Sequence, residues 1–204
     1  MSITDRLSDR RTLAVWLADQ IREDITQTSA PGQALREKEL ADRFQVSRIP
    51  LREALRRLEA ESYVTIQPYR GAIVTRLSAD DAVEIAEMRS ALMQLAVRQA
   101  LPRIADADLL RLNELLSAMT SEPDAHRWSR LISEFHTILF AVPDRPILME
   151  HLRTLQTRSR RYHMYIYRNV HLRRLAERCL RDLSVACNDR DPEHAARLVA
   201  DYFD

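Results

Sequence analysis

Glycine occurs only twice in this chain of 204 residues, at Gly32 and Gly71. A sheet-rich fold needs many turns in which a residue takes a positive φ, and glycine supplies most of them. The same scarcity excludes the glycine-rich loops that bind nucleotide phosphates. Apolar residues instead recur at helical spacing over most of the chain, which is typical of amphipathic helices. The sequence therefore predicts a mostly α-helical protein.

The first 76 residues combine helical patterns with a short hairpin pattern. Apolar spacing and the breaks between the patterns predict helices over about 12–28, 35–46 and 47–61. The apolar period then changes to two in a pair of short stretches, and Gly71 supplies the turn between them. Three helices followed by a two-stranded wing form a winged helix-turn-helix. We therefore expect residues 1–76 to be a DNA-binding domain.

The remaining residues, 77–204, carry only helical patterns. Prolines and polar joins divide them into predicted helices over 81–100, 106–119, 125–142, 146–168, 171–188 and from 192 to the end. Six helices joined by short connections predict an all-α bundle, which we expect to bind an effector and to dimerise.

Bulk properties place the protein in the cytoplasm. The N-terminus is polar and mixed in charge, unlike a signal peptide, and no apolar run reaches the roughly 20 residues that a membrane helix needs. Cys179 and Cys187 fall eight residues apart on one predicted helix, so they cannot bridge each other. We expect buried, reduced thiols and no membrane partner.

Charge is unevenly distributed, although the net charge is only +1. Between Ser47 and Arg57 four arginines stand against Glu53 alone. A basic helix face usually means no more than a solvated surface. On a nearly neutral protein it also suits a site-specific DNA binder.

The run LREKELADRFQVSRIPLREALRRLEAESYVTIQPYRGAIV, residues 35–74, closely resembles the DNA-binding domain of the GntR family of bacterial regulators. One departure is Ser62, where the family usually has glycine before the first wing strand. The shared pieces are Glu39-Leu40-Ala41, Val46-Ser47-Arg48, Pro50-Leu51-Arg52-Glu53-Ala54-Leu55, Leu58-Glu59 and Gly71. The resemblance implies DNA contacts by Lys38, Ser47, Arg48, Ile49 and Arg52, and by Tyr69, Arg70 and Gly71 in the wing.

The chemistry of these side chains agrees with such contacts. An arginine at the start of a helix in the major groove, as expected for Arg48, can donate two hydrogen bonds to guanine. Arg52, one turn later, can take a base or a phosphate. Ser47 and the free N–H groups beside it suit a phosphate.

The helical region resembles, more loosely, the FCD-type effector domain of the FadR subfamily. The likeness rests on 84–100, with Arg89 at the position of a characteristic arginine, and on 134–140, which contains His136. Many such domains hold a divalent metal with one aspartate and three histidines, and the metal binds a small carboxylate. Here Ile132, and residues near Leu180 and Tyr202, stand where three of the four ligands belong. We therefore expect no metal cofactor, unless a site is rebuilt from other residues.

A pocket without a metal can still bind an anion through arginine. We expect Arg158 and Arg161 to be solvated. The candidate effector-binding residues are Arg89, His136, Arg160, His163 and Tyr165.

The main hypothesis is a homodimeric repressor that reads a palindromic operator and is controlled by a small organic acid. An alternative is a DNA-binding protein that is ligand-blind or regulated by a partner, with a degenerate pocket. A helical enzyme is not expected, because the sequence shows no arrangement of nucleophile, base and orienting group.

Overall fold

The computed structural model describes residues 10–27, 31–67 and 71–203. Its contacts divide the chain into two compact units, an N-terminal unit (Met1–Ser78) and a C-terminal unit (Ala79–Asp204). No helix within the described ranges is long and apolar enough to span a membrane.

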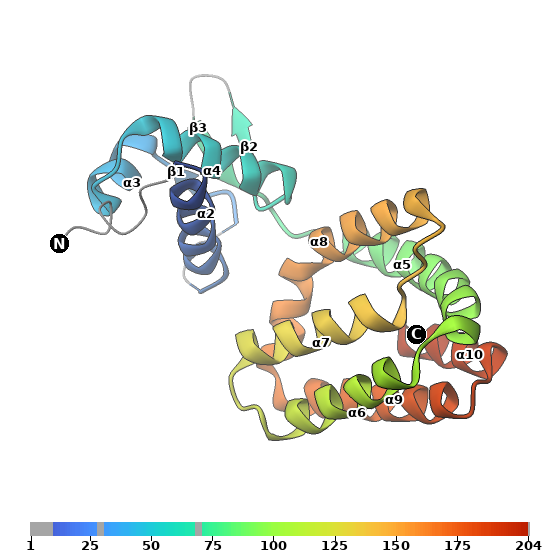
Figure 1. Cartoon of the computed structure of the whole chain (residues 1–204). Coiled ribbons are helices and arrows are strands. Elements are labelled where there is room, and N and C mark those ends of the chain that lie inside the picture. Colours follow the sequence, from blue (N-terminus) through green and yellow to red (C-terminus); the bar gives the residue numbers. More distant parts are fainter. Residues whose placement is uncertain (1–9, 28–30, 68–70, 204) are drawn as a thin grey trace. The chain divides into compact units, whose positions relative to one another are not determined.

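The N-terminal unit places a small sheet beside three helices (Figure 1). The antiparallel sheet has the order β1-β3-β2, and Val64 of β2 pairs with Val74 of β3. In chain order the elements are α2 (Arg10–Gln27), β1 (Ala34–Leu35), α3 (Glu37–Phe44), α4 (Arg48–Ala60), β2 (Val64–Gln67) and β3 (Gly71–Val74).

Packing of α2 against α4 builds the core of this unit. Leu17 and Ile21 of α2 and Leu55 of α4 are at most 2% exposed, which is the burial expected of an apolar helix stripe. Trp16 and Phe44 pack against this core and against each other, with ring centroids 5.8 Å apart. The apolar spacing of the sequence therefore identified the buried faces of both helices.

The predicted two-stranded hairpin is present as β2 and β3, but the sheet of the wing has a third strand that was not predicted. The third is β1, which takes Leu35 from the segment predicted to be helical and pairs it with Ala72 of β3. The backbone N–H of Val74 also donates to the carbonyl of Gln33 across 2.9 Å. These bonds satisfy the outer edge of β3, whose peptide groups would otherwise lack partners.

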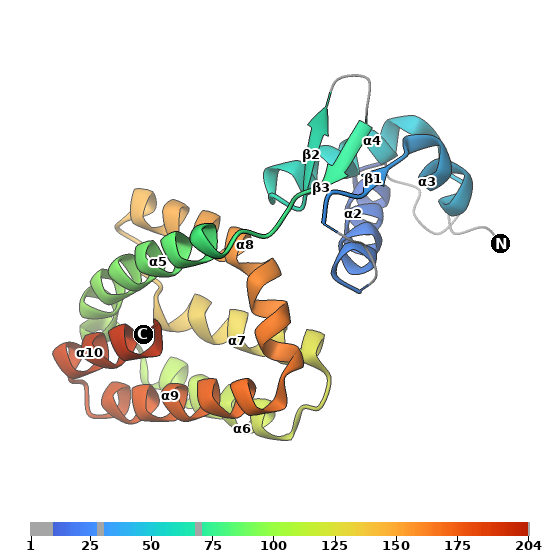
Figure 2. The same cartoon turned by 180° about the vertical axis from the view of Figure 1, so that it is seen from behind.

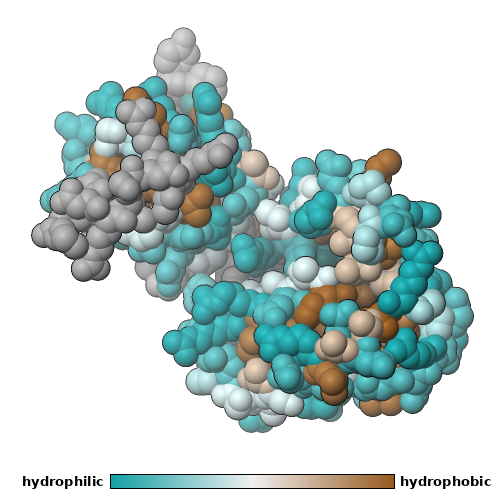
Figure 3. All heavy atoms as spheres, in the orientation of Figure 1, coloured by the Kyte–Doolittle hydropathy of each residue, from teal (hydrophilic) through white to brown (hydrophobic). Residues whose placement is uncertain are grey.

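The C-terminal unit is built from helices alone. Figures 1 and 2 show α6 beside α9 and α5 beside α10, and both pairs are in contact. On the face seen in Figure 3, hydrophilic residues cover most of this unit. The elements are α5 (Ala79–Ala100), η1 (Leu101–Arg103), α6 (Asp106–Ser121), α7 (Ala125–Leu139), α8 (Pro146–Arg168), α9 (Val170–Asn188) and α10 (Pro192–Phe203).

Two details of this unit differ from expectation. Helix α7 ends at Leu139 rather than at Val142, because a residue before a proline, here Val142, disfavours the helical conformation. Cys187 is buried as expected, whereas Cys179 is only half-buried. Both lie on α9, where their positions keep them from bridging each other.

The turn from α4 into β2 carries backbone strain. Ser62, which stands where related sequences usually have glycine, has a φ of 61°. A side chain in this left-handed region costs roughly 1–2 kcal/mol, and glycine avoids that cost.

We therefore expect Ser62→Gly to be more stable than Ser62→Ala by about 1 kcal/mol. Both variants remove the serine side chain, so their difference isolates the backbone term. Hydrogen exchange of the α4 amides measures the opening of this unit. Equal protection in the two variants would show that the turn is not strained.

Candidate functional site

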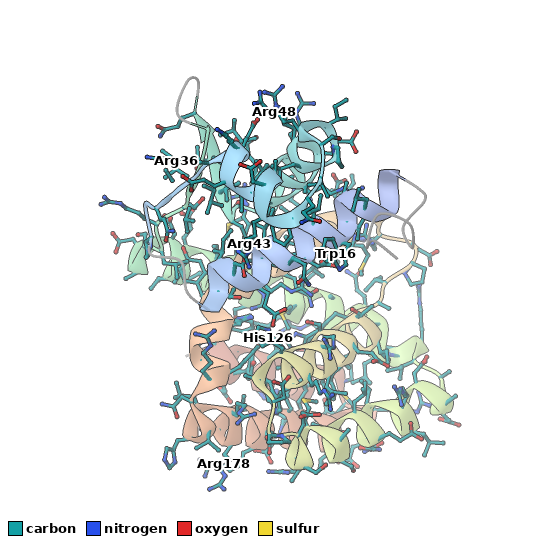
Figure 4. The ribbon with its side chains drawn as sticks, turned by 90° about the vertical axis from the view of Figure 1, so that its left-hand side faces the viewer. Trp16, Arg36, Arg43, Arg48, His126 and Arg178 are labelled. Atoms are coloured by element: carbon teal, nitrogen blue, oxygen red, sulfur yellow. The ribbon has the colours of Figure 1, made fainter. Side chains whose placement is uncertain are left out.

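The N-terminal unit exposes a polar face at the beginnings of α3 and α4. Lys38 in the first turn of α3, and Ser47 and Arg48 at the start of α4, are exposed. Ile49 is 60% exposed, although large apolar side chains are usually buried. Figure 4 shows Arg48 directed away from the body of this unit. All four side chains are therefore open to a partner.

An ion pair connects the two helix beginnings. Nε of Arg52 donates to both carboxylate oxygens of Glu37, at 3.2 and 3.0 Å. Arg52 is still 63% exposed, so a nucleic acid could reach it by competing with Glu37. Ser47 occupies the N-cap position of α4 but makes no side-chain capping bond. Its hydroxyl therefore remains free to bind a phosphate.

Strand β3 of the wing begins with a glycine in the left-handed region of backbone conformation. Gly71 has a φ of +77°, and a Cβ there would lie 3.5 Å from the carbonyl oxygen of Leu35. The predicted contacts Tyr69 and Arg70 lie outside the described residues.

The C-terminal unit buries an arginine that has no carboxylate partner among the described residues. Arg89 of α5 is 2% exposed. Its Nη1 donates to Nε2 of His163 on α8 across 2.8 Å, and its guanidinium carbon lies 5.1 Å from the centre of the Phe203 ring. Burial lowers the pKa of Arg89 below its ordinary value, while nearby tyrosines oppose that shift. An incompletely paired buried cation is costly, and an anion would relieve that cost.

The histidines beside Arg89 are neutral. Burial, and then the charge of Arg89, lower the pKa of His136 to about 3. Burial, Arg89 and His136 lower the pKa of His163 well below its usual range. A neutral His163 can accept from Arg89 at Nε2, which agrees with the hydrogen bond. Arg89 therefore places a buried positive charge beside two neutral imidazoles.

Two tyrosines complete the surroundings of Arg89. Tyr167 and Tyr202 share a side-chain hydrogen bond, and burial raises the pKa of both phenols. Tyr167 also packs on Trp128, with centroids 4.5 Å apart. Protonated phenols can donate to an anion but do not compensate the charge of Arg89.

Arg89, His163 and Tyr167 line two cavities. The polar cavity, of about 280 Å³, lies between α7 and α8 and adds Ser129, Ile132, Ser133, His136, Arg153, Gln156, Thr157 and Arg160. The apolar cavity, of about 380 Å³, adds side chains of α5, α8, α9 and α10, including Ile85, Ile166, Leu175 and Phe203.

The residues around His136 do not fit the metal that related domains hold. Ile132 lines the polar cavity one turn before His136, and Leu180 lies in the apolar core. The Tyr202 ring is 6.3 Å from the His136 ring, but its phenol stays protonated. Across the described chain, no group of three or more histidines, cysteines, aspartates or glutamates could hold a metal ion.

Four of the five predicted effector residues meet at the polar cavity: Arg89, His136, Arg160 and His163. The side chain of Tyr165 lies outside the described part of the chain. The sequence did not predict Tyr167 or Phe203 near Arg89, and it marked Tyr202 only as lying near a substituted metal-ligand position. The spacing of His163 and Tyr167 along one helix could have indicated the first of them.

Comparisons with known families match both units. Residues 13–74 match the family described as "Bacterial regulatory proteins, gntR family", and residues 84–204 match the FCD domain.

Individual relatives agree with the families. The chain is 34% identical to the Nta operon transcriptional regulator of Aminobacter aminovorans, over 64% of this chain and 63% of the relative, so it spans less than two thirds of that protein. It is 30% identical to the transcriptional repressor GlaR of Escherichia coli, over 92% of this chain and 89% of GlaR. The solved structure of E. coli McbR/YncC shares the fold, with a TM-score of 0.73 at 23% identity over 94% of this chain and 93% of that chain.

The neutral state of His136 makes the C-terminal unit sensitive to acid. The ordinary pKa of 6.5 applies in the unfolded chain, whereas the folded value is about 3. Between pH 7 and pH 5 protons therefore bind the unfolded state in preference. We expect this residue alone to lower the unfolding free energy by about 2 kcal/mol at pH 5.

The measurement is urea unfolding at pH 7 and pH 5, followed by Trp128 fluorescence in a Trp16→Phe background. In His136→Gln the unfolding free energy should fall by about 2 kcal/mol less between pH 7 and pH 5 than in the wild type. His171→Gln, at an exposed position, should behave as the wild type does. Identical pH dependence in the wild type and in His136→Gln would contradict the assignment.

Proposed function

Because the chain belongs to the GntR family of bacterial regulatory proteins and carries an FCD domain, we propose that it is a sequence-specific DNA-binding transcription regulator. The observation that carries the proposal is the exposed polar face at the beginnings of α3 and α4. Lys38 of α3 and Arg48 in the first turn of α4 both belong to this face, and both are exposed. The family to which the chain belongs consists of regulators rather than enzymes.

In the proposed complex α4 enters the major groove. Arg48 donates to a guanine edge, while Ser47 and the N–H groups at the start of α4 take a phosphate. Arg52 exchanges Glu37 for a base or a phosphate. Two copies related by a two-fold axis read the two halves of a palindrome. Repression is the proposed direction, and the relative GlaR is named a repressor.

The proposed effector is a small organic acid bound in the polar cavity. Its carboxylate accepts hydrogen bonds from Arg89, which is buried without a carboxylate partner among the described residues. Arg153 and Arg160 also line this cavity and suit a second anionic group. Ligand binding and DNA binding then influence each other by the same factor, as linkage requires.

Replacing Arg48 or Arg52 by alanine should weaken binding to a duplex that the wild-type protein selects from a random pool. A lost bidentate contact to guanine costs about 1–3 kcal/mol, so we expect up to about a hundredfold weaker binding. Arg57→Ala, on the opposite flank of α4, is the matched control. Fluorescence anisotropy gives the three affinities, and unchanged binding in both test variants would overturn the proposed DNA contact.

Replacing Arg89 by methionine should abolish ligand binding. The methionine removes the incompletely paired charge, so we expect the melting temperature without ligand to rise or stay the same. In the wild type, an acid at a hundred times its Kd should add about 2.7 kcal/mol of stability.

A thermal-shift screen with glycolate, malate, gluconate and benzoate makes the measurement, with the exposed Arg158→Met as the control. A shift that survives in Arg89→Met would exclude this site. No shift with any acid would favour the alternative of a ligand-blind or partner-controlled regulator, which the poorly fitting metal positions already make plausible.

A further inference from the structure

A second charged cavity lies elsewhere in the C-terminal unit and shares no lining residue with the two cavities at Arg89. This arginine cleft, of about 820 Å³, lies between the end of α6 with the segment that follows it and the first half of α9. Its charged side chains are Arg173, Arg174, Arg178 and Arg181, against Glu122 and Glu177.

Both glutamates of the arginine cleft are occupied by other partners. Oε1 of Glu177 accepts from the indole N–H of Trp128 across 3.1 Å, and this glutamate is only 7% exposed. Oε1 of Glu122 accepts from the backbone N–H of Asp124 across 2.9 Å. Neither carboxylate forms an ion pair with the cleft arginines in the described chain. Four arginines against two carboxylates leave the arginine cleft with a formal net charge of +2.

Two of the arginines form hydrogen bonds across the cleft. Nη1 of Arg173 donates to the carbonyls of Glu122 and Pro123, at 3.1 and 3.0 Å. Arg181 donates to Oγ1 of Thr120 across 3.3 Å. Nε of Arg173 is the one buried side-chain polar atom without a hydrogen-bond partner among the residues that the structure describes. The cleft thus holds two guanidinium groups positioned by hydrogen bonds, and Nε of one of them is unpaired in the described structure.

The other two arginines are exposed one helical turn apart on α9. Arg174 and Arg178 share a face because residues four apart lie above one another on a helix. Figure 4 shows Arg178 at the outer edge of the C-terminal unit, directed away from the ribbon. The cleft also includes Val170, the first residue of α9, where the helix dipole adds positive potential.

We propose that the arginine cleft is a second ligand site, which binds the phosphate groups of a small phosphorylated molecule. Guanidinium groups match phosphate oxygens in geometry and charge. The hydrogen-bonded pair Arg173 and Arg181, together with the exposed pair Arg174 and Arg178, can bind two neighbouring phosphate groups. Met119, Pro123 and Val170 supply an apolar wall for the rest of the ligand. The alternative is that these arginines form only a solvated basic helix face. Such a face needs neither hydrogen bonds across a cleft nor the cleft itself.

The test is isothermal titration of the full chain with inorganic pyrophosphate at constant ionic strength. We expect one site per chain, weakened at least tenfold in the double variant Arg174→Ala and Arg178→Ala. Alanine is the best helix former, and both positions are exposed, so the variant should keep its fold. The matched control is Arg197→Ala, an exposed arginine on α10.

Arg89→Met should bind pyrophosphate as the wild type does, so this outcome is independent of the proposed effector site. A parallel titration with duplex DNA separates two sources of phosphate. If the double variant loses affinity for pyrophosphate alone, the ligand is a small molecule. If it loses affinity for duplex DNA equally, the cleft binds a nucleic acid backbone instead, and the proposal of a small ligand is overturned. No pyrophosphate binding, or equal binding in the double variant and the wild type, would overturn the site.

Discussion

The buried charge of Arg89 is the constraint on which the chemistry of the C-terminal unit depends. Burial, and then the charge of the Arg89 guanidinium, lower the pKa of His136 and His163, and His163 is the hydrogen-bond partner of Arg89. Arg89 also lines both the polar cavity and the apolar cavity. Since a buried cation is costly without an anion, the proposed carboxylate ligand would stabilise this unit. In the proposed account, the residue whose burial is costly in the free protein is also the one that recognises the ligand.

The N-terminal unit prepares its surface in a different way. Arg52 is tied to Glu37 in the free protein, whereas Arg48 and Ile49 are already exposed at the start of α4. An exposed ion pair contributes little stability, so its exchange for a phosphate requires little energy. In the proposed complex, Arg52 can therefore leave Glu37 for DNA, while Arg48 is already exposed.

Much of this could be predicted from the sequence, because helical periodicity reports which residues are buried. The apolar stripes of α2 and α4, and the arginine at position 89, followed from spacing and resemblance. The strand β1 did not, since a two-residue strand has no periodic pattern and forms only when β3 offers its edge. The side chains of Tyr167, Tyr202 and Phe203 come from distant helices. Only tertiary packing brings them to Arg89.

The central claim is that a carboxylate at Arg89 controls DNA binding. It is tested most directly by the affinity for a selected duplex with and without an acid that raises the melting temperature, in the wild type and in Arg89→Met. The account predicts a change of roughly 5- to 150-fold in the wild type, the usual range of allosteric coupling, and none in the variant. The same affinity with and without the acid, or an equal change in Arg89→Met, would contradict it.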